Sequence, residues 1–255
     1  MTERIVWITG AGKGIGRALA LELARGGDRI AASARTEKDL DSLVAEAAAF
    51  GGDVRAFPLD IADDRACEAS VARIEKEMGA IGLAVLNAGT HAEISSLGFD
   101  LETFSRVVGT NLVGTANCLA ALLPRLVSRG SGHLAFVSSL AARPGLPTAG
   151  AYAASKAGLT ALWEAMTPEL ESAGIASTLV EPGFVDTPLT RLNTFAMPFL
   201  MEPEQAARII ARGLARKKTR IAFPWQMAVA IGLLRLLPHR LLFAITRTMV
   251  RTPRT

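Results

Sequence analysis

Short apolar runs alternate with longer segments of helical character along most of this chain. Runs of four to six residues rich in Val, Ile, Leu and Ala are typical of buried strands. They predict strands over residues 5–9, 29–33, 54–59, 83–86, 134–137, 175–180 and 220–223. Strands that alternate with helices predict an α/β fold, and no linker-like stretch divides the first 223 residues.

The helices are expected between these strands. They are expected after a glycine-rich turn at 10–16, then over about 37–50, 64–78 and 101–127, around 152–156, and over 203–216. Asp63 has the residue type and position of a helix cap. Residues 112–123 form a block that is more apolar than one buried helix face requires.

Composition describes a globular, enzyme-sized protein. The chain has 255 residues, of which 50% are hydrophobic and 20% charged, so it can bury a large core and is not disordered. Cys67 and Cys118 lack the spacing of a metal site and are expected to be reduced thiols. The amino terminus reads as a strand and not as a signal peptide. These features favour the cytoplasm.

Charge is unevenly distributed. The net charge is +4, but residues 205–255 hold eleven Lys or Arg and no acid, while the preceding residues hold 17 bases against 24 acids. No zinc-ligand spacing and no interleaving of arginine with aromatic residues is present, so neither a metal site nor nucleic-acid binding is expected.

The turn Gly10-Ala11-Gly12-Lys13-Gly14-Ile15-Gly16 joins the first strand to a helix. Backbone N–H groups and the helix dipole at such a junction form a site for phosphate. The spacing is not GxGxxG, because Ile15 stands where that pattern requires its third glycine. A tight turn without a ligand is the simpler alternative.

Tyr152 and Lys156 are four residues apart and share one face of a helix, which brings a cation beside a phenol. At roughly 5 Å and an effective dielectric of ~20, one charge supplies about 3 kcal/mol, on the order of two pKa units. The pair suits general acid/base catalysis, and a second positive charge, such as an oxidised nicotinamide, would help. A half-buried ring beside a solvated lysine is the alternative.

Ser138 and Ser139 end an apolar run thirteen to fourteen residues before Tyr152. With Asn111, Ser139, Tyr152, Lys156 and the opening TGAGKGIG, the chain resembles the short-chain dehydrogenase/reductases over about residues 4–223. The resemblance implies a Rossmann-type, doubly wound, mainly parallel seven-strand sheet in the order 3-2-1-4-5-6-7, with helices on both faces. It also implies an oxidoreductase that reduces a carbonyl to an alcohol or catalyses the reverse.

The resemblance assigns the catalytic roles. Tyr152 would give the proton and Ser139 would hold the substrate oxygen. Lys156 would lower the pKa of Tyr152 and bind ribose, and Asn111 would disrupt its helix locally and hold a water of a proton relay. The residues it implies for the cofactor are Gly10, Gly12, Lys13, Gly14, Ile15, Gly16, Arg35, Asp60, Ile61, Asn87, Ala88, Gly89, Tyr152, Lys156, Pro182, Gly183, Val185 and Thr187. The chain departs from the family at Leu86, where a second asparagine is usual.

The end of the second strand predicts the cofactor. An NAD enzyme presents an acid there to the ribose 2′-hydroxyl, whereas NADP requires a cation. Ala34 occupies the acid's position, Arg35 follows it, and Lys13 is a second cation in the glycine turn. NADP(H) is therefore expected over NAD(H), although both cations could instead be solvated surface charges.

The resemblance further implies a small-molecule carbonyl or alcohol substrate, a homodimer or homotetramer, and an apolar lid over about 188–202 that includes Phe195, Met197, Phe199 and Leu200. None of His91, His133 and His239 lies near a G-x-S-x-G nucleophile elbow, so a hydrolase is not expected. The functional alternative is a sensor or scaffold of the same fold that binds nucleotide without turnover.

Residues 1–223 are expected to form the catalytic domain, with 224–255 as a helical extension. Residues 227–237 are apolar except for Arg235 and are too short to span a bilayer. The next segment places Arg240, Arg247 and Arg251 on one stripe. Two interpretations stay open: a helical pair packed on the protein or a partner subunit, or a membrane-surface contact through 221–255 that would suit a lipophilic substrate.

Overall fold

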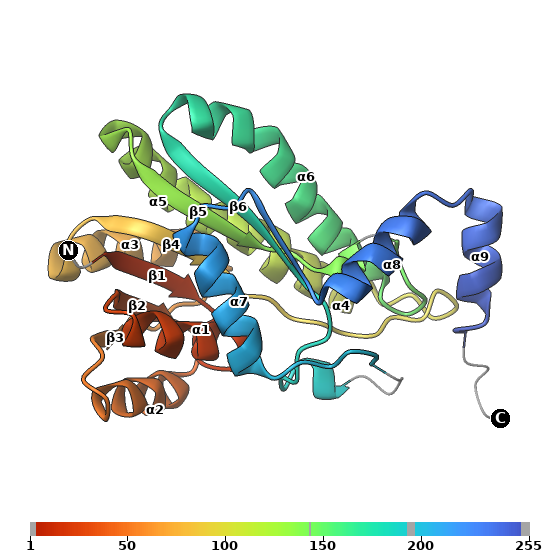
Figure 1. Ribbon diagram of the computed structural model, residues 1–255, viewed down its shortest axis with the longest axis horizontal. Helices are drawn as coiled ribbons and strands as arrows, with labels where there is room; N and C mark the ends of the chain where they lie inside the picture. The colour runs from red at the N-terminus through yellow and green to blue at the C-terminus, as the bar shows by residue number, and fades with distance from the viewer. Residues whose placement is uncertain (1–3, 143, 193–196, 251–255) are drawn as a thin grey trace.

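A seven-stranded parallel sheet forms the centre of the protein. The computed structural model describes residues 4–142, 144–192 and 197–250. Every neighbouring pair of strands is parallel, in the order β3-β2-β1-β4-β5-β6-β7, which confirms the expected topology (Figure 1). The strands are β1 (Ile5–Thr9), β2 (Arg29–Ser33), β3 (Val54–Ala56), β4 (Ile81–Leu86), β5 (Gly132–Val137), β6 (Ile175–Pro182) and β7 (Arg220–Phe223).

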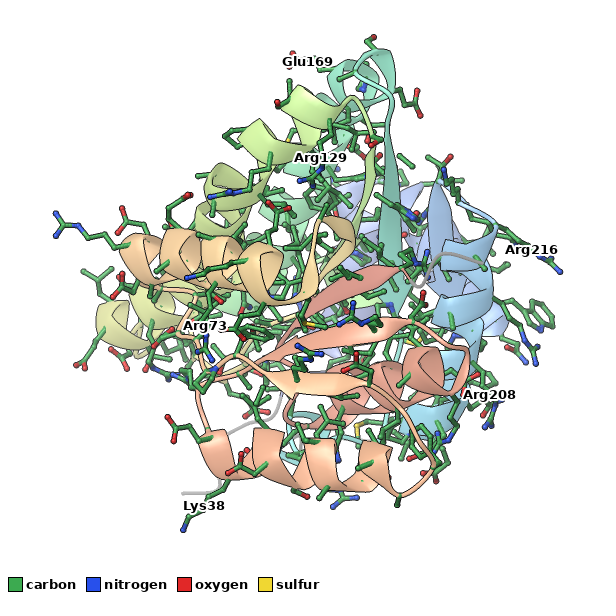
Figure 2. All side chains as sticks on the ribbon, turned by 90° about the vertical axis from the view of Figure 1, so that its left-hand side faces the viewer. Lys38, Arg73, Arg129, Glu169, Arg208 and Arg216 are labelled. Carbon is green, nitrogen blue, oxygen red and sulfur yellow. The ribbon has the colours of Figure 1, made fainter. Side chains whose placement is uncertain are left out.

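Helices cover both faces of the sheet (Figure 1). They are α1 (Gly14–Arg25), α2 (Glu37–Ala48), α3 (Asp64–Met78), α4 (Leu101–Val108), α5 (Gly114–Arg129), α6 (Gly150–Ser172), α7 (Pro203–Ala215), α8 (Trp225–Arg235) and α9 (His239–Arg247). One buried cluster joins α1, α2 and α7 to the sheet, and a second joins α3, α5 and α6 to the opposite face. The charged side chains labelled Lys38, Glu169 and Arg208 point outward from these layers (Figure 2).

β1 shows why the strands read as continuous apolar runs. All five of its residues are buried. Val6 and Ile8 belong to the cluster on the α1 face, while Ile5 and Trp7 belong to the cluster on the α3 face. Because successive side chains point to opposite faces, a strand covered on both sides needs apolar residues at every position.

Two elements differ from expectation. β3 ends at Ala56 and not at residue 59, although Phe57 and Leu59 still donate to the carbonyl oxygens of Ala32 and Ala34 at 2.8 and 3.0 Å, so the chain stays bonded to β2 beyond the end of the strand. The helix expected over 101–127 is divided by a π-helical turn, Gly109–Val113. Asp63 caps α3 as expected, since its carboxylate accepts from the Ala66 N–H at 2.9 Å.

The stretch Leu101–Arg129 is long and apolar enough to cross a membrane by length and composition. It contains the π-helical turn, and Val107, Cys118 and Leu122 are fully buried, as expected of a core helix. Cys118 meets Cys67 of α3 with the two sulfur atoms 3.9 Å apart, and both are free thiols. The fold thus pairs two cysteines that no sequence spacing relates.

Candidate active site

Three of the four candidate catalytic residues, Ser139, Tyr152 and Lys156, meet at the carboxyl edge of the sheet, whereas Asn111 does not line the pocket there. Asn87 and Gly89 follow β4, Ser139 follows β5, and α6 supplies Tyr152 and Lys156. They line one pocket together with Ile15, Val137, Ser138, Pro182, Gly183, Val185, Thr187, Leu189 and Thr190. Ligands collect at this edge in open α/β sheets.

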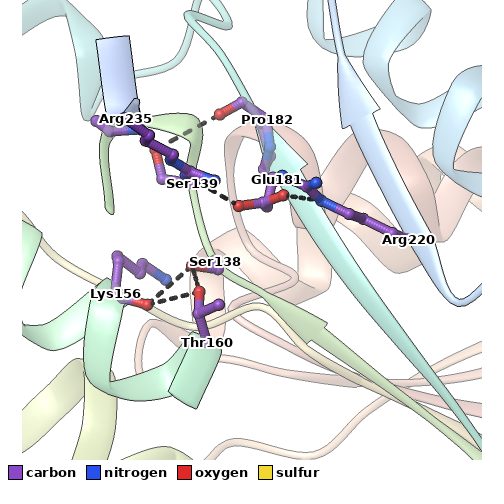
Figure 3. A network of polar contacts seen from close by, with 9 residues as sticks. Ser138, Ser139, Lys156, Thr160, Glu181, Pro182, Arg220 and Arg235 are labelled. Atoms are coloured by element: carbon purple, nitrogen blue, oxygen red, sulfur yellow. Dashed lines mark hydrogen bonds and ion pairs between the residues drawn. The ribbon is translucent and has the colours of Figure 1, made fainter. Parts of the chain in front are cut away.

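Ser138 holds α6 against the end of β5 (Figure 3). Its hydroxyl donates to the Lys156 carbonyl at 2.9 Å and lies 2.8 Å from the Thr160 hydroxyl. The Thr160 hydroxyl also donates to the Lys156 carbonyl, at 3.0 Å. Of the two adjacent serines, Ser138 is therefore committed to structure. Ser139, whose hydroxyl is 3.5 Å from the Pro182 carbonyl, faces the pocket with Tyr152.

The Tyr152 phenol and the Lys156 ammonium lie close together, with the Nζ atom 6.0 Å from the centre of the ring. Burial raises the pKa of Tyr152, and a hydrogen bond with Ser139 opposes that rise. Burial also lowers the pKa of Lys156 to about 8. Lys156 was expected to lower the pKa of Tyr152, but in the polypeptide alone the desolvation of the Tyr152 hydroxyl is the larger effect and the pKa is raised.

Lys156 is fixed by its own hydrogen bond. Its Nζ donates to the Val137 carbonyl at 2.7 Å, at the end of β5. A Cβ atom at Gly89 would lie 3.3 Å from this Nζ and 3.2 Å from the Asn111 Oδ1. Gly89 thus lies against both Lys156 and Asn111, and any side chain at this position would have to displace them.

Asn111 lies in the π-helical turn and is fully buried. Its amide nitrogen donates to the Thr90 carbonyl and to the Ser155 hydroxyl, each at 2.9 Å. Its side-chain oxygen accepts from the Thr90 N–H at 2.7 Å. These bonds join the loop after β4 to α6 and leave one acceptor position on the side-chain oxygen. The local disruption expected of Asn111 is present.

His91 is a neighbour of Tyr152 that the sequence analysis missed. The two rings meet edge to face with centroids 5.1 Å apart. Burial lowers the pKa of His91, against a smaller opposing effect of Glu93. Its Nδ1 is buried without a hydrogen-bond partner among the described residues. No spacing rule distinguishes this histidine, because the contact depends on how the loop after β4 meets α6.

The glycine turn fits a diphosphate group. Lys13 occupies the cap position of α1 without a capping hydrogen bond, and the first turn of α1 contains no acid, so its N–H groups are free for an anion. Gly10 and Gly14 have φ of +67° and +55°. A Cβ at Gly16 would lie 2.3 Å from the Gly10 carbonyl oxygen, so the helix could not approach the strand with any other residue there.

The surroundings of the glycine turn contain an acid that the sequence did not predict there. Ala34 carries no acid, but Asp39 of α2 reaches the same place: its carboxylate is 3.1 Å from the Lys13 ammonium. A Cβ at Gly12 would contact both Asp39 and Ala34. Arg35 is exposed and makes no ion pair within the described ranges. One of the two expected phosphate-binding cations is therefore already paired.

Of the other expected cofactor residues, some lie at or beside the pocket and others lie away from it. Asn87 donates to the Thr9 carbonyl at 3.0 Å and so ties β4 to β1, with Ala88 beside it. Gly14 packs on Thr187, since a Cβ there would lie 2.8 Å from the threonine methyl. Asp60 and Ile61 do not line the pocket. The Asp60 carboxylate accepts from the Ala62 N–H at 3.0 Å, and the Ile61 carbonyl accepts from Asn117 at 2.9 Å.

A family profile described as short chain dehydrogenase matches residues 4–195. The chain belongs to the short-chain dehydrogenase family. It is an oxidoreductase of a family that acts on CH–OH or C=O groups with NAD(P)(H).

Similar proteins agree with this assignment. An uncharacterized oxidoreductase of Myxococcus xanthus is 38% identical over 249 residues, which is 98% of each chain. The probable oxidoreductase EphD of Mycobacterium tuberculosis is 38% identical over 77% of this chain, which spans 33% of that longer protein. Among solved structures, levodione reductase superposes with a TM-score of 0.82 at 25% identity, covering 89% of this chain and 99% of that one.

In this short-chain dehydrogenase the extension packs near the pocket, and Figure 3 draws Arg235 of α8 close to Ser139 and Glu181. Glu181 is 1% exposed at the end of β6, paired with Arg220 of β7 and, at 3.4 Å, with Arg235 of α8. A Cβ at Gly183 would lie 2.7 Å from the sulfur of Met227. The inner face of α8 is therefore packed on the protein, as expected if the extension packs on the body.

The expected lid is described only in part. A 3-10 turn, Thr190–Leu192, follows Thr187, and the Thr187 hydroxyl lies 3.1 Å from that of Thr190. Phe199 and Leu200 are exposed. Phe195 of the expected lid and Arg251 of the expected basic stripe lie outside the described residues.

Proposed function

We propose that the protein interconverts a carbonyl compound and an alcohol with NADP(H), using Tyr152 as the acid and base. The observation that carries the proposal is the convergence of Ser139, Tyr152 and Lys156 on one pocket that Gly183 and Thr187 also line. A sensor or scaffold of the same fold would bind nucleotide without needing these three side chains together.

Each residue has a distinct part in the proposal. The bound nicotinamide would supply or accept hydride. Ser139 binds the substrate oxygen, and the Tyr152 hydroxyl gives that oxygen a proton during reduction. Lys156 stabilises the phenolate that remains, because a buried cation beside an anion favours its charged form. Asn111 holds the loop after β4 on α6 and offers one acceptor to a water of the relay.

The preference for NADP(H) rests on Arg35, which is exposed beside the glycine turn and unpaired within the described residues. Lys13 adds a second cation, although Asp39 partly neutralises it. We also propose that the enzyme acts in the cytoplasm as a homodimer or homotetramer. Val113, exposed on the π-helical turn within the apolar block 112–123, would suit a subunit contact.

The test is Tyr152→Phe, which removes one hydroxyl and keeps the ring against His91. We expect NADPH oxidation over a panel of carbonyl compounds to fall at least about 100-fold in kcat, because a positioned acid contributes that much. NADPH affinity should stay within a few-fold. Retention of more than about a tenth of kcat would exclude Tyr152 as the principal acid. An inactive wild-type protein that binds NADPH would instead favour the scaffold.

A further inference from the structure

Exposed apolar side chains gather at the catalytic edge of the sheet. Most of the large apolar side chains exposed within the described residues lie in three segments: the loop after β4 with the start of α4, the loop after β6, and the extension after β7. These are Leu97, Phe99, Leu101, Phe199, Leu200, Trp225, Val229, Leu233, Leu236, Leu241, Phe243, Ile245, Met249 and Val250. Since the strands are parallel, this is also the edge at which the active-site pocket lies.

The outer face of α8 has the reverse of the usual polarity. At 100° per residue, Trp225, Val229, Leu233 and Leu236 fall within about 80° of one another. They are 70%, 54%, 62% and 80% exposed. The charge of this helix, Arg235, is turned toward Glu181. α8 thus presents an uncharged apolar stripe to the outside, and an exposed patch of this kind marks an interaction surface.

α9 extends the same surface. It buries only Leu242 and Thr246 among its own residues. Figure 1 places it at the end of the molecule, beyond α8 and away from the sheet. Arg240 and Arg247 are exposed between its apolar side chains. The acids of this edge near α4, such as Asp100, lie on a different segment, because no acid occurs anywhere from residue 205 to 255.

Charge decides which occupant suits this surface. A second copy docked by a two-fold axis would bring the same face, with Arg240 and Arg247, against itself, and like charges would repel. Anionic headgroups complement those arginines, while the acyl boundary accommodates the apolar stripe. We propose that the outer faces of α8 and α9 dock on an anionic lipid bilayer, which places the mouth of the active site at the membrane surface.

The proposal is tested by co-sedimentation of the full chain with phosphatidylcholine vesicles that contain phosphatidylglycerol. We expect the protein to pellet with them at low salt. The partition coefficient should fall about tenfold on vesicles of phosphatidylcholine alone, and likewise near ~1 M salt, where the Debye length is about 3 Å. Because the measurement is binding, it is independent of the proposed activity.

Two variants make the test specific. Val229→Asp together with Leu233→Asp should lower the partition coefficient at least about tenfold. Val127→Asp is the matched control, because Val127 is also 54% exposed on a helix but lies near the end of α5, at the opposite edge of the sheet. It should bind vesicles like the wild type. Both proteins should keep the wild-type circular dichroism spectrum, since all three positions are exposed.

Three results would overturn the proposal. One is failure of the wild type to pellet with anionic vesicles at low salt. Another is equal binding by the Val229→Asp/Leu233→Asp protein and the wild type. The third is a wild type that does not bind lipid and that sediments as a dimer, while the double variant sediments as a monomer at sedimentation equilibrium. This result would assign the surface to a second copy of the chain.

Discussion

Lys156 is a buried cation, and no carboxylate pairs with it in the described part of the chain. Burial lowers its pKa to about 8 from an ordinary 10.5. Between these values the unfolded chain binds a proton that the folded protein does not, so the free energy of unfolding rises with pH across this window. At pH 7 both states are protonated, and the whole cost of burying the charge is present.

This predicts a pH-dependent difference between the wild type and Lys156→Met. From pH 8 to about 10, the wild type should gain up to about 3 kcal/mol of unfolding free energy relative to the variant. The lost hydrogen bond to Val137 is the same at both pH values and does not affect this difference. Urea unfolding at the two pH values measures it, and parallel pH profiles would show that Lys156 is not desolvated.

We expect cofactor choice to depend on three side chains beside the glycine turn, Lys13, Arg35 and Asp39. Arg35→Ala should weaken NADPH by about 1.5 to 3 kcal/mol, the usual loss of charge-assisted bonds to a phosphate, and leave NADH unchanged. Fluorescence titration with both cofactors measures this.

Asp39→Asn is the converse variant, because it frees Lys13 from its ion pair. It should tighten NADPH by several-fold and leave NADH within about twofold. Equal effects of either variant on the two cofactors would contradict the assignment of a 2′-phosphate site here.

Among individual site residues, the sequence predicts those that belong to a recognisable motif. Asn111, Ser139, Tyr152 and Lys156 were predicted from residue types and spacing within a family resemblance. Asp39 and His91 were not, because each acts through a contact between segments that spacing does not relate: Asp39 with Lys13 across the glycine turn, and His91 with Tyr152 across two elements.

Elements were predictable where apolar periodicity is strong. Each strand begins and ends within three residues of expectation, and β1, β2 and β7 match it at both ends. The π-helical turn at Asn111 has no periodic signature of its own and was expected only through the resemblance. β3 ends three residues earlier than its apolar pattern predicts, although Phe57 and Leu59 continue to donate to β2.

The junction of β6, β7 and α8 depends on a buried carboxylate. Arg220→Ala should lower the free energy of unfolding by about 2 kcal/mol, less than the full cost of an unpaired buried charge because Arg235 still faces Glu181. Adding Glu181→Gln should restore most of the loss, since the buried carboxylate charge is then removed and only the partly exposed Arg235 keeps its charge there. Arg55→Ala, which breaks an exposed pair with Asp53, should change stability by less than about 1 kcal/mol.

Chemical denaturation of these variants forms a double-mutant cycle. If Glu181→Gln does not rescue Arg220→Ala, the loss lies in packing around Arg220, and the charge cluster does not determine how α8 is attached.

For the whole molecule, the strand order was predicted by family resemblance, whereas the position of the extension was not. The apolar and basic composition of residues 224–255 is equally compatible with packing and with an interfacial helix. The contact that fixes α8 joins Arg235 to Glu181, 54 residues earlier in the chain, and depends on where β6 ends. A long-range ion pair of this kind leaves no local pattern in the sequence.

We expect the body to be a folding unit without the extension. In the described residues, none of the three clusters includes a residue after Phe223. A chain that ends after Pro224 should therefore unfold in one cooperative transition, with its unfolding free energy lowered by about 1–3 kcal/mol through the loss of Arg235 and of the cover over Gly183. Calorimetry of both chains measures this. A truncated chain without a cooperative transition would place α8 inside the folding unit and make 1–223 the wrong domain boundary.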